Sequence, residues 1–172
     1  MVFHLFKFSG LQQRSTCDVV RFYNRTIWAA EPAKTELEPM AYPISTIFVG
    51  TTETAACFTS DDCIEIVGGI QRDSLKDGYD DILHHFLVGN DARTYVGLDY
   101  QHASPYLTNL TTPEKNALWI KYISFDEMTV TPKMFTILYQ ILKCGVERVS
   151  SLCQLQYQCI FEHSNLSLFF YL

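Results

Sequence analysis

The segment from Thr131 to Glu147 constrains the fold most, because it joins a long apolar run to a clear helix-start signal. A threonine such as Thr131 accepts hydrogen bonds from the free amide groups of a helix start, and proline, here Pro132, is favoured at the first helical position. The apolar residues that follow cover more than one helix face: Met134, Phe135, Leu138, Tyr139, Ile141 and Leu142. This pattern predicts a helix buried inside a domain.

Glu147 stands at the far end of this apolar run. A buried carboxylate needs a partner, a raised pKa or a chemical function, so Glu147 is a candidate site residue. The alternative is that Gly145 ends the helix and leaves Glu147 in solvent, because glycine is favoured just past a helix C-terminus. This stretch leaves both interpretations open.

The composition indicates one soluble domain. The chain has 172 residues, of which 48% are hydrophobic and 19% charged, which suits a single core and excludes a disordered chain. No apolar segment is long enough to span a membrane. A formal net charge of −6 gives no general attraction to nucleic acid, so any RNA contact would depend on a local patch.

The N-terminal segment 1–8 alternates apolar with other residues and lacks the pattern of a secretory signal, so we expect a strand and, by default, a cytoplasmic protein. The six cysteines show no metal-ligand spacing such as C-x-x-C, and buried thiols are the expectation.

The order of predicted elements favours an α+β fold. A strand at 2–8 and a helix at 15–30 come first, and a strand at 44–49 is followed by an antiparallel hairpin of 54–58 and 63–67. Helices are then predicted from 73 to 86, from 112 to 122 and from 131 onward, with a short strand or loop entry at 93–100. The result is an N-terminal mixed or antiparallel sheet with a helix, followed by a mainly helical half.

Asp80-Asp81 and His84-His85 place carboxylate and imidazole one turn apart if the segment is helical, which is metal-ligand spacing. A metal-dependent hydrolase built on Asp81 and His85 is therefore one hypothesis. The alternative is a solvated acidic face with ordinary histidines, which the lack of a third ligand nearby favours.

Several segments together resemble the ribosome-inactivating proteins, the rRNA N-glycosylases that include the ricin and Shiga toxin A chains. Residues 53–68 look like the family's hairpin, and Gly97-Leu-Asp-Tyr100 is similar to its Gly-Gly-Asn-Tyr. Residues 112–122 and 132–147 look like its later helices. The resemblance implies a ribosome-inactivating-protein-like domain over residues 1–150 and a divergent C-terminal tail over 151–172.

The resemblance also implies a reaction: hydrolysis of the bond between ribose and an exposed adenine of large-subunit rRNA, which inhibits translation in a toxin or defence role. Glu147 would be the catalytic carboxylate and Tyr100 one of two rings that stack on the base. The second tyrosine position falls at Glu65 and the catalytic arginine position at Ser150, which are departures from the family. The implied partner is the ribosome, the implied form is a monomer, and no metal or organic cofactor is implied.

A second hypothesis from another functional class is a non-catalytic interaction module of α+β fold, which would use an aromatic surface to bind a protein partner.

Overall fold

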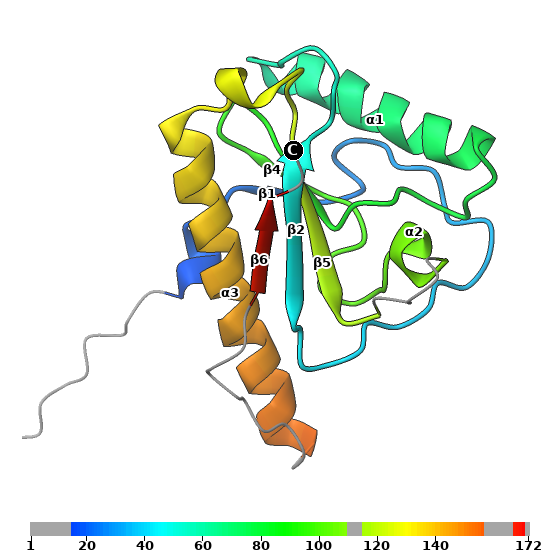
Figure 1. Ribbon diagram of the computed structural model, residues 1–172, viewed down its shortest axis with the longest axis vertical. Coiled ribbons are helices and arrows are strands. Elements are labelled where there is room, and N and C mark those ends of the chain that lie inside the picture. Colours follow the sequence, from blue (N-terminus) through cyan, green and yellow to red (C-terminus); the bar gives the residue numbers. More distant parts are fainter. Residues whose placement is uncertain (1–14, 110–114, 157–166, 171–172) are drawn as a thin grey trace, which may run out of the picture.

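The computed structural model describes residues 15–109, 115–156 and 167–170, which form a central six-stranded sheet with helices on both sides (Figure 1). The long helix α3 lies on one side of the sheet, and α1 and the short α2 lie on the other. The fold is thus a mixed α/β arrangement rather than a sheet followed by a helical half.

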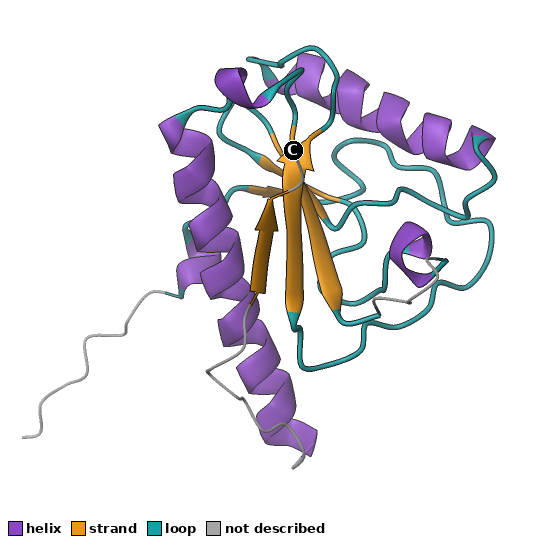
Figure 2. Cartoon of the chain, in the orientation of Figure 1, coloured by secondary structure: helices purple, strands orange, loops and turns teal. Residues whose placement is uncertain are grey.

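The sheet has the strand order β1-β4-β3-β5-β2-β6. Figure 2 shows its strands in orange with helices in purple around them. All neighbouring strands are parallel except β3 and β4, which form an antiparallel pair. The strands are β1 (Phe22–Tyr23), β2 (Thr46–Thr51), β3 (Phe86–Val88), β4 (Thr94–Val96), β5 (Ala117–Tyr122) and β6 (Ser167–Phe170).

The helices of the structure confirm the predicted start of the long helix at Pro132. The helices are α1 (Ser60–Lys76), α2 (Pro105–Thr108) and α3 (Pro132–Gln156), with 3-10 turns η1 (Thr16–Asp18) and η2 (Glu127–Thr129). The start of α3 at Pro132 is as predicted. The helix continues past Gly145 to Gln156, which excludes the alternative that Gly145 ends it. Gly145 instead makes room for a neighbouring ring, since an added Cβ would lie 2.7 Å from Cε1 of Tyr100.

The predicted hairpin of 54–58 and 63–67 is wrong, because residues 60–76 form α1. Thr59 caps this helix by accepting a hydrogen bond from the Asp62 amide, and two acidic residues in the first turn complement the helix dipole. Cys63 and Val67 then lie one turn apart and are fully buried against the sheet. Capping and burial outweigh the strand preference of the β-branched residues here.

The predicted helices at 112–122, 73–86 and 15–30 are also wrong. Residues 117–122 form β5, whose side chains alternate between buried and half-buried from Leu118 onward. The helix α1 ends at Lys76 and residues 86–88 form β3, while the 15–30 segment contains η1 and β1. The mainly helical second half is therefore incorrect, because it supplies central strands of the sheet.

Two predictions concern residues that lie largely outside the described part of the chain. The predicted strand at 2–8 lies wholly outside it. In the tail, β6 pairs with β2 in parallel register, and α3 continues past residue 150. The division into 1–150 and 151–172 stays a prediction.

Two apolar clusters fill the two sides of the sheet. The cluster on the α3 side contains Ile47, Phe86, Ile120 and Ile141, and the cluster on the α1 side contains Trp28, Val67, Leu87 and Tyr95. In the described residues no helix has the length and apolarity needed to cross a bilayer.

Four cysteines form disulfides where the sequence led us to expect thiols. Cys17 pairs with Cys144 of α3, and Cys57 pairs with Cys63 of α1. The other two, Cys153 and Cys159, have side chains outside the described part of the structure. The cysteines therefore fix loops to helices.

Candidate functional site

The sheet face on the α1 side is covered by helix α1 over β3 and β4, whereas β5 and β2 present half-buried side chains there. Register pairs Phe48 with Trp119 and Gly50 with Lys121, and paired residues of parallel strands share a face. We call this surface, made by Phe48, Trp119 and Lys121 together with His84 and Tyr106 beside them, the open sheet face. In Figure 1, the strand β5 of this face lies between β2 and α2.

Three rings pack together on the open sheet face. The indole of Trp119 lies 4.5 Å from the His84 ring and 4.9 Å from the Tyr106 ring, measured between centroids. Tyr106 of α2 keeps 39% of its surface exposed. The position of α2 is fixed by Ser104, whose buried hydroxyl donates to the carbonyl of Leu83 at 2.6 Å. The result is an aromatic surface with a buried imidazole at its base.

His84 is held neutral by its surroundings. Burial, then the positive charge of Lys121 and then His85, lower its pKa to about 3. Its Nδ1 has no hydrogen-bond partner among the described residues. Buried polar atoms are nearly always paired, so the ring contributes packing against Trp119 while its Nδ1 is left available for a hydrogen bond.

His85, the next residue, is explained by the fold. Its Nδ1 accepts a hydrogen bond from the Trp119 amide at 2.8 Å, so its Nε2 carries the proton and donates to the His102 carbonyl at 3.0 Å. Burial lowers its pKa to about 4. His85 therefore stays neutral and ties the start of β3 to β5.

Lys121 supplies the cation of the open sheet face. Its Nζ donates to the carbonyl of Thr51 at 2.9 Å and lies 5.5 Å from the centroid of the Trp119 ring. Burial lowers its pKa, and the negative charge of Glu53 acts in the opposite direction. A partly desolvated ammonium beside an aromatic ring binds an anion more strongly than a fully hydrated one.

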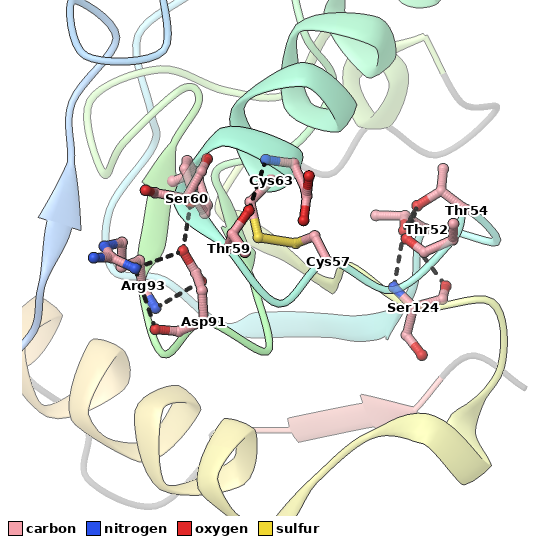
Figure 3. The surroundings of a disulfide bond; sticks show 12 residues. Thr52, Thr54, Cys57, Thr59, Ser60, Cys63, Asp91, Arg93 and Ser124 are labelled. Atoms are coloured by element: carbon pink, nitrogen blue, oxygen red, sulfur yellow. Dashed lines mark hydrogen bonds and ion pairs between the residues drawn. A yellow bond between two sulfur atoms is a disulfide. The ribbon is translucent and has the colours of Figure 1, made fainter.

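The loop after β2 borders this face and is fixed at both ends (Figure 3). At one end Thr52 accepts a hydrogen bond from the Ser124 amide at 3.2 Å. At the other, Cys57 is bonded to Cys63 of α1. The disulfide lies against Gly89, where an added Cβ would be 2.8 Å from the Cys63 sulfur. The border of the face is therefore rigidly placed.

The hypothesis of a metal site on Asp81 and His85 does not hold. Both His85 nitrogens are engaged by backbone groups, and Asp81 is buried with one oxygen bound to Arg25 at 2.9 Å and to Gln71 at 2.7 Å. The segment is not helical, so the expected one-turn spacing is lost. In the described residues, no group of three or more His, Cys, Asp or Glu side chains could hold a metal ion.

The structure gives Tyr100 a role in the core. Its ring is 3% exposed and lies 4.7 Å from the Phe86 ring, and its hydroxyl donates to the Ile141 carbonyl at 2.6 Å. Burial raises its pKa. Tyr100 therefore anchors α3 to the sheet and presents no open ring face to a purine.

Glu147 binds the N-terminal segment rather than a ligand cleft. Its carboxylate accepts hydrogen bonds from the Ser15 hydroxyl at 2.6 Å and from the Thr16 amide at 2.9 Å. These bonds lower its pKa. Glu65 is exposed on α1, and Ser150 lies in α3 with its side chain outside the described part. The structure does not bring these four residues together into one described site.

The residues of the open sheet face were missed in the sequence, apart from His84, which was assigned to a helix. The available signal was the order of residues in 117–122, where Trp119 and Lys121 alternate with apolar neighbours at strand spacing. The Thr112-Pro113 pair, which is typical of a helix start, predicted a helix for these residues instead of a strand.

The known proteins that match the chain are of one kind, although the search of family models finds none. Peptidoglycan-recognition protein LC of Drosophila melanogaster is 23% identical over 130 residues, which are 75% of this chain and 25% of that protein. Peptidoglycan recognition protein of Bombyx mori is 31% identical over 110 residues, which are 63% of this chain and 55% of that protein. The matched parts are thus about a quarter and about half of these relatives.

Solved structures give the same result. The ectodomain of the Drosophila transmembrane receptor PGRP-LCa has a TM-score of 0.67 and 25% identity, covering 74% of this chain and 77% of that one. Peptidoglycan recognition protein LE, in complex with tracheal cytotoxin, has a TM-score of 0.67 and 21% identity, covering 76% and 75%. Its ligand is described as a monomeric diaminopimelic acid-type peptidoglycan.

These findings overturn the resemblance to ribosome-inactivating proteins. The relatives and structural neighbours are peptidoglycan recognition proteins. The predicted rRNA N-glycosylase activity, the ribosome as partner and the toxin role in translation inhibition are therefore wrong. The second hypothesis, an interaction module without catalysis, agrees better with these relatives.

Proposed function

We propose that this chain is a recognition module that binds a peptidoglycan fragment on the open sheet face. The observation that carries the proposal is the convergence of Trp119, Tyr106 and Lys121 on the half of the sheet that α1 leaves uncovered. The relatives and a ligand-bound structural neighbour support the choice of ligand.

The chemistry of the ligand suits these side chains. A peptidoglycan fragment joins sugar rings to a short peptide, so it presents apolar C–H faces and carboxylates together. Sugar C–H faces pack on aromatic rings, which Trp119 and Tyr106 provide. A carboxylate is attracted to the ammonium of Lys121, whose partial burial strengthens the contact.

The proposed activity is binding, because the open sheet face combines aromatic rings with one cation and a neutral buried imidazole. Such a set orients and holds a ligand with sugar and acidic parts. Rigid borders at the Cys57–Cys63 disulfide and at Thr52 keep the face in its binding shape, which reduces the ordering cost on association.

Isothermal titration calorimetry with tracheal cytotoxin tests the proposal. Trp119→Ala should weaken binding by about tenfold or more, as expected for removing a central aromatic contact worth about 1–3 kcal/mol. Lys121→Gln should weaken it by about fivefold and reduce its dependence on salt.

Matched controls lie on α3, on the other side of the sheet. Tyr139→Ala removes an exposed aromatic ring and Lys143→Gln removes an exposed cation, and both should bind like the unaltered chain. Equal affinity of Trp119→Ala and Tyr139→Ala would remove the open sheet face from the proposal. Absence of binding by the unaltered chain would refute the proposal itself.

A further inference from the structure

A separate cleft lies on the α3 side of the sheet. It has a volume of about 290 Å³ and is formed by the segment before β1, the turn between β3 and β4, and the first half of α3. Its lining residues are Val19, Val20, Arg21, Asp91, Ala92, Lys133, Thr136, Ile137 and Gln140. None of them belongs to the open sheet face.

The floor of this cleft is apolar and its rim is cationic. Val20 and Ile137 are 7% and 8% exposed, so they present a small apolar surface. Arg21 and Lys133 are exposed on the rim and have no ion-pair partner among the described residues. Arg21 and Lys133 thus place two cations, neither in an ion pair within the described part of the chain, at one cleft of a chain whose formal net charge is −6.

Asp91, the acidic residue of the lining, does not neutralise these cations. Its side chain is fully buried, and one carboxylate oxygen is held by Arg93 at 3.1 Å and by the Tyr95 hydroxyl at 2.7 Å (Figure 3 shows the contacts with Arg93). Its charge is compensated by Arg93 within the turn. Among the residues that line the cleft, the charges outside such a pair are therefore those of Arg21 and Lys133.

The walls of the cleft are held in place from both sides. The Cys17–Cys144 disulfide and the Glu147 hydrogen bonds to Ser15 and Thr16 attach the segment before β1 to α3. The carbonyl of Arg21 accepts a hydrogen bond from the Thr94 amide at 3.0 Å. A site built this way needs little ordering before it binds.

We infer that this cleft binds a small ligand with an apolar side chain and a carboxylate, such as an acylated amino acid or the C-terminal residue of a peptide. The apolar part would pack on Val20 and Ile137, and the carboxylate would lie between Arg21 and Lys133. This inference does not depend on the proposed function, since the two sites lie on opposite sides of the sheet.

Backbone amide NMR of the whole chain during titration with N-acetyl-leucine tests the inference. Shifts should appear at residues 19–21, 92 and 133–140, and N-acetyl-leucinamide, the neutral analogue, should shift them much less. Arg21→Gln combined with Lys133→Gln should weaken binding at least about fivefold, the order expected for two partly exposed charge contacts.

Two further variants keep the test decisive. Lys143→Gln, which removes an exposed cation of α3 outside the cleft, should leave the affinity unchanged. Thr136→Trp, at an exposed position of the cleft wall, should fill the cleft and abolish the shifts. Equal shifts with the neutral analogue, no shifts, or shifts only on the open sheet face would each overturn the inference.

Discussion

His84 and His85 are adjacent, and both are neutral near pH 7, but their ring nitrogens have different hydrogen-bond partners. Both ring nitrogens of His85 form hydrogen bonds with backbone groups of residues 119 and 102, whereas Nδ1 of His84 has no hydrogen-bond partner among the described residues. Burial disfavours the charged form and lowers both pKa values from the ordinary 6.5, to about 3 for His84 and about 4 for His85. The pair therefore links stability to pH.

Stability should fall as the pH is lowered from about 6.5 toward 4. In this range the unfolded chain protonates its histidines while the folded chain does not, so protons favour unfolding. The loss should be on the order of 3 kcal/mol per histidine by pH 4. Urea unfolding at a series of pH values measures it.

His84→Phe separates the two histidines in the same experiment. It keeps an aromatic ring against Trp119 and removes the unpaired nitrogen, so it should unfold with a weaker dependence on pH and without large loss of stability at pH 7.5. Stability that does not change between pH 7 and 4.5 in the unaltered chain would contradict the neutral, buried state of both rings.

Gly145 and Gly69 are both helical glycines in different surroundings. An alanine Cβ at Gly145 would lie 2.7 Å from the Tyr100 ring, whereas at Gly69 the nearest atom is the end of the Arg72 side chain at 3.8 Å. We expect Gly145→Ala to lower the free energy of unfolding by about 1–3 kcal/mol, because the ring anchors α3 and must shift.

Gly69→Ala is the matched control. It should raise the free energy of unfolding by up to about 1 kcal/mol, because alanine favours the helix and meets no obstacle. Thermal unfolding of the two variants compares them directly. If Gly145→Ala were as stable as Gly69→Ala, the packing of Tyr100 against α3 would be refuted.

At the level of elements, two disulfides hold segments of very different length. Cys17 and Cys144 are separated by 127 positions in the chain, and Cys57 and Cys63 by 6. The longer link connects η1 to the middle of α3, next to the Glu147 hydrogen bonds. The shorter one fixes the loop after β2 to α1.

Removing the longer link should cost more stability. Loop-closure entropy gives about 5 kcal/mol for the Cys17–Cys144 pair and about 2 kcal/mol for the Cys57–Cys63 pair, before any effect of packing. Denaturant unfolding of the double Cys→Ala variants measures both. An equal or reversed order would show that unfolded-state entropy does not dominate.

The elements also show what the sequence alone could predict. The start of α3 was predictable because Thr131, Pro132 and a dense apolar run agree. The helix α1 was not, because Ile64, Ile66 and Val67 favour strands and a Gly-Gly pair interrupts the helix pattern; burial against the sheet decides its form. The strand β5 follows a Thr-Pro pair that resembles a helix start, and its pairing with β2 and β3 overrides that signal.

At the scale of the whole molecule, the candidate site could not be predicted because it is assembled from distant segments. His84 precedes β3, Tyr106 lies in α2, and Trp119 and Lys121 lie in β5. These side chains are close together and accessible because α1 covers the other half of this sheet face. No local sequence pattern specifies which half α1 covers. The residues that the sequence did single out, Glu147 and Tyr100, attach α3 to the rest of the fold.

The proposed binding of a peptidoglycan fragment to the open sheet face can be located directly in the molecule. Backbone amide NMR during titration with tracheal cytotoxin should show its largest shifts around residues 84, 106 and 119–121. Shifts confined to α3, or the absence of any shift at millimolar ligand, would contradict it.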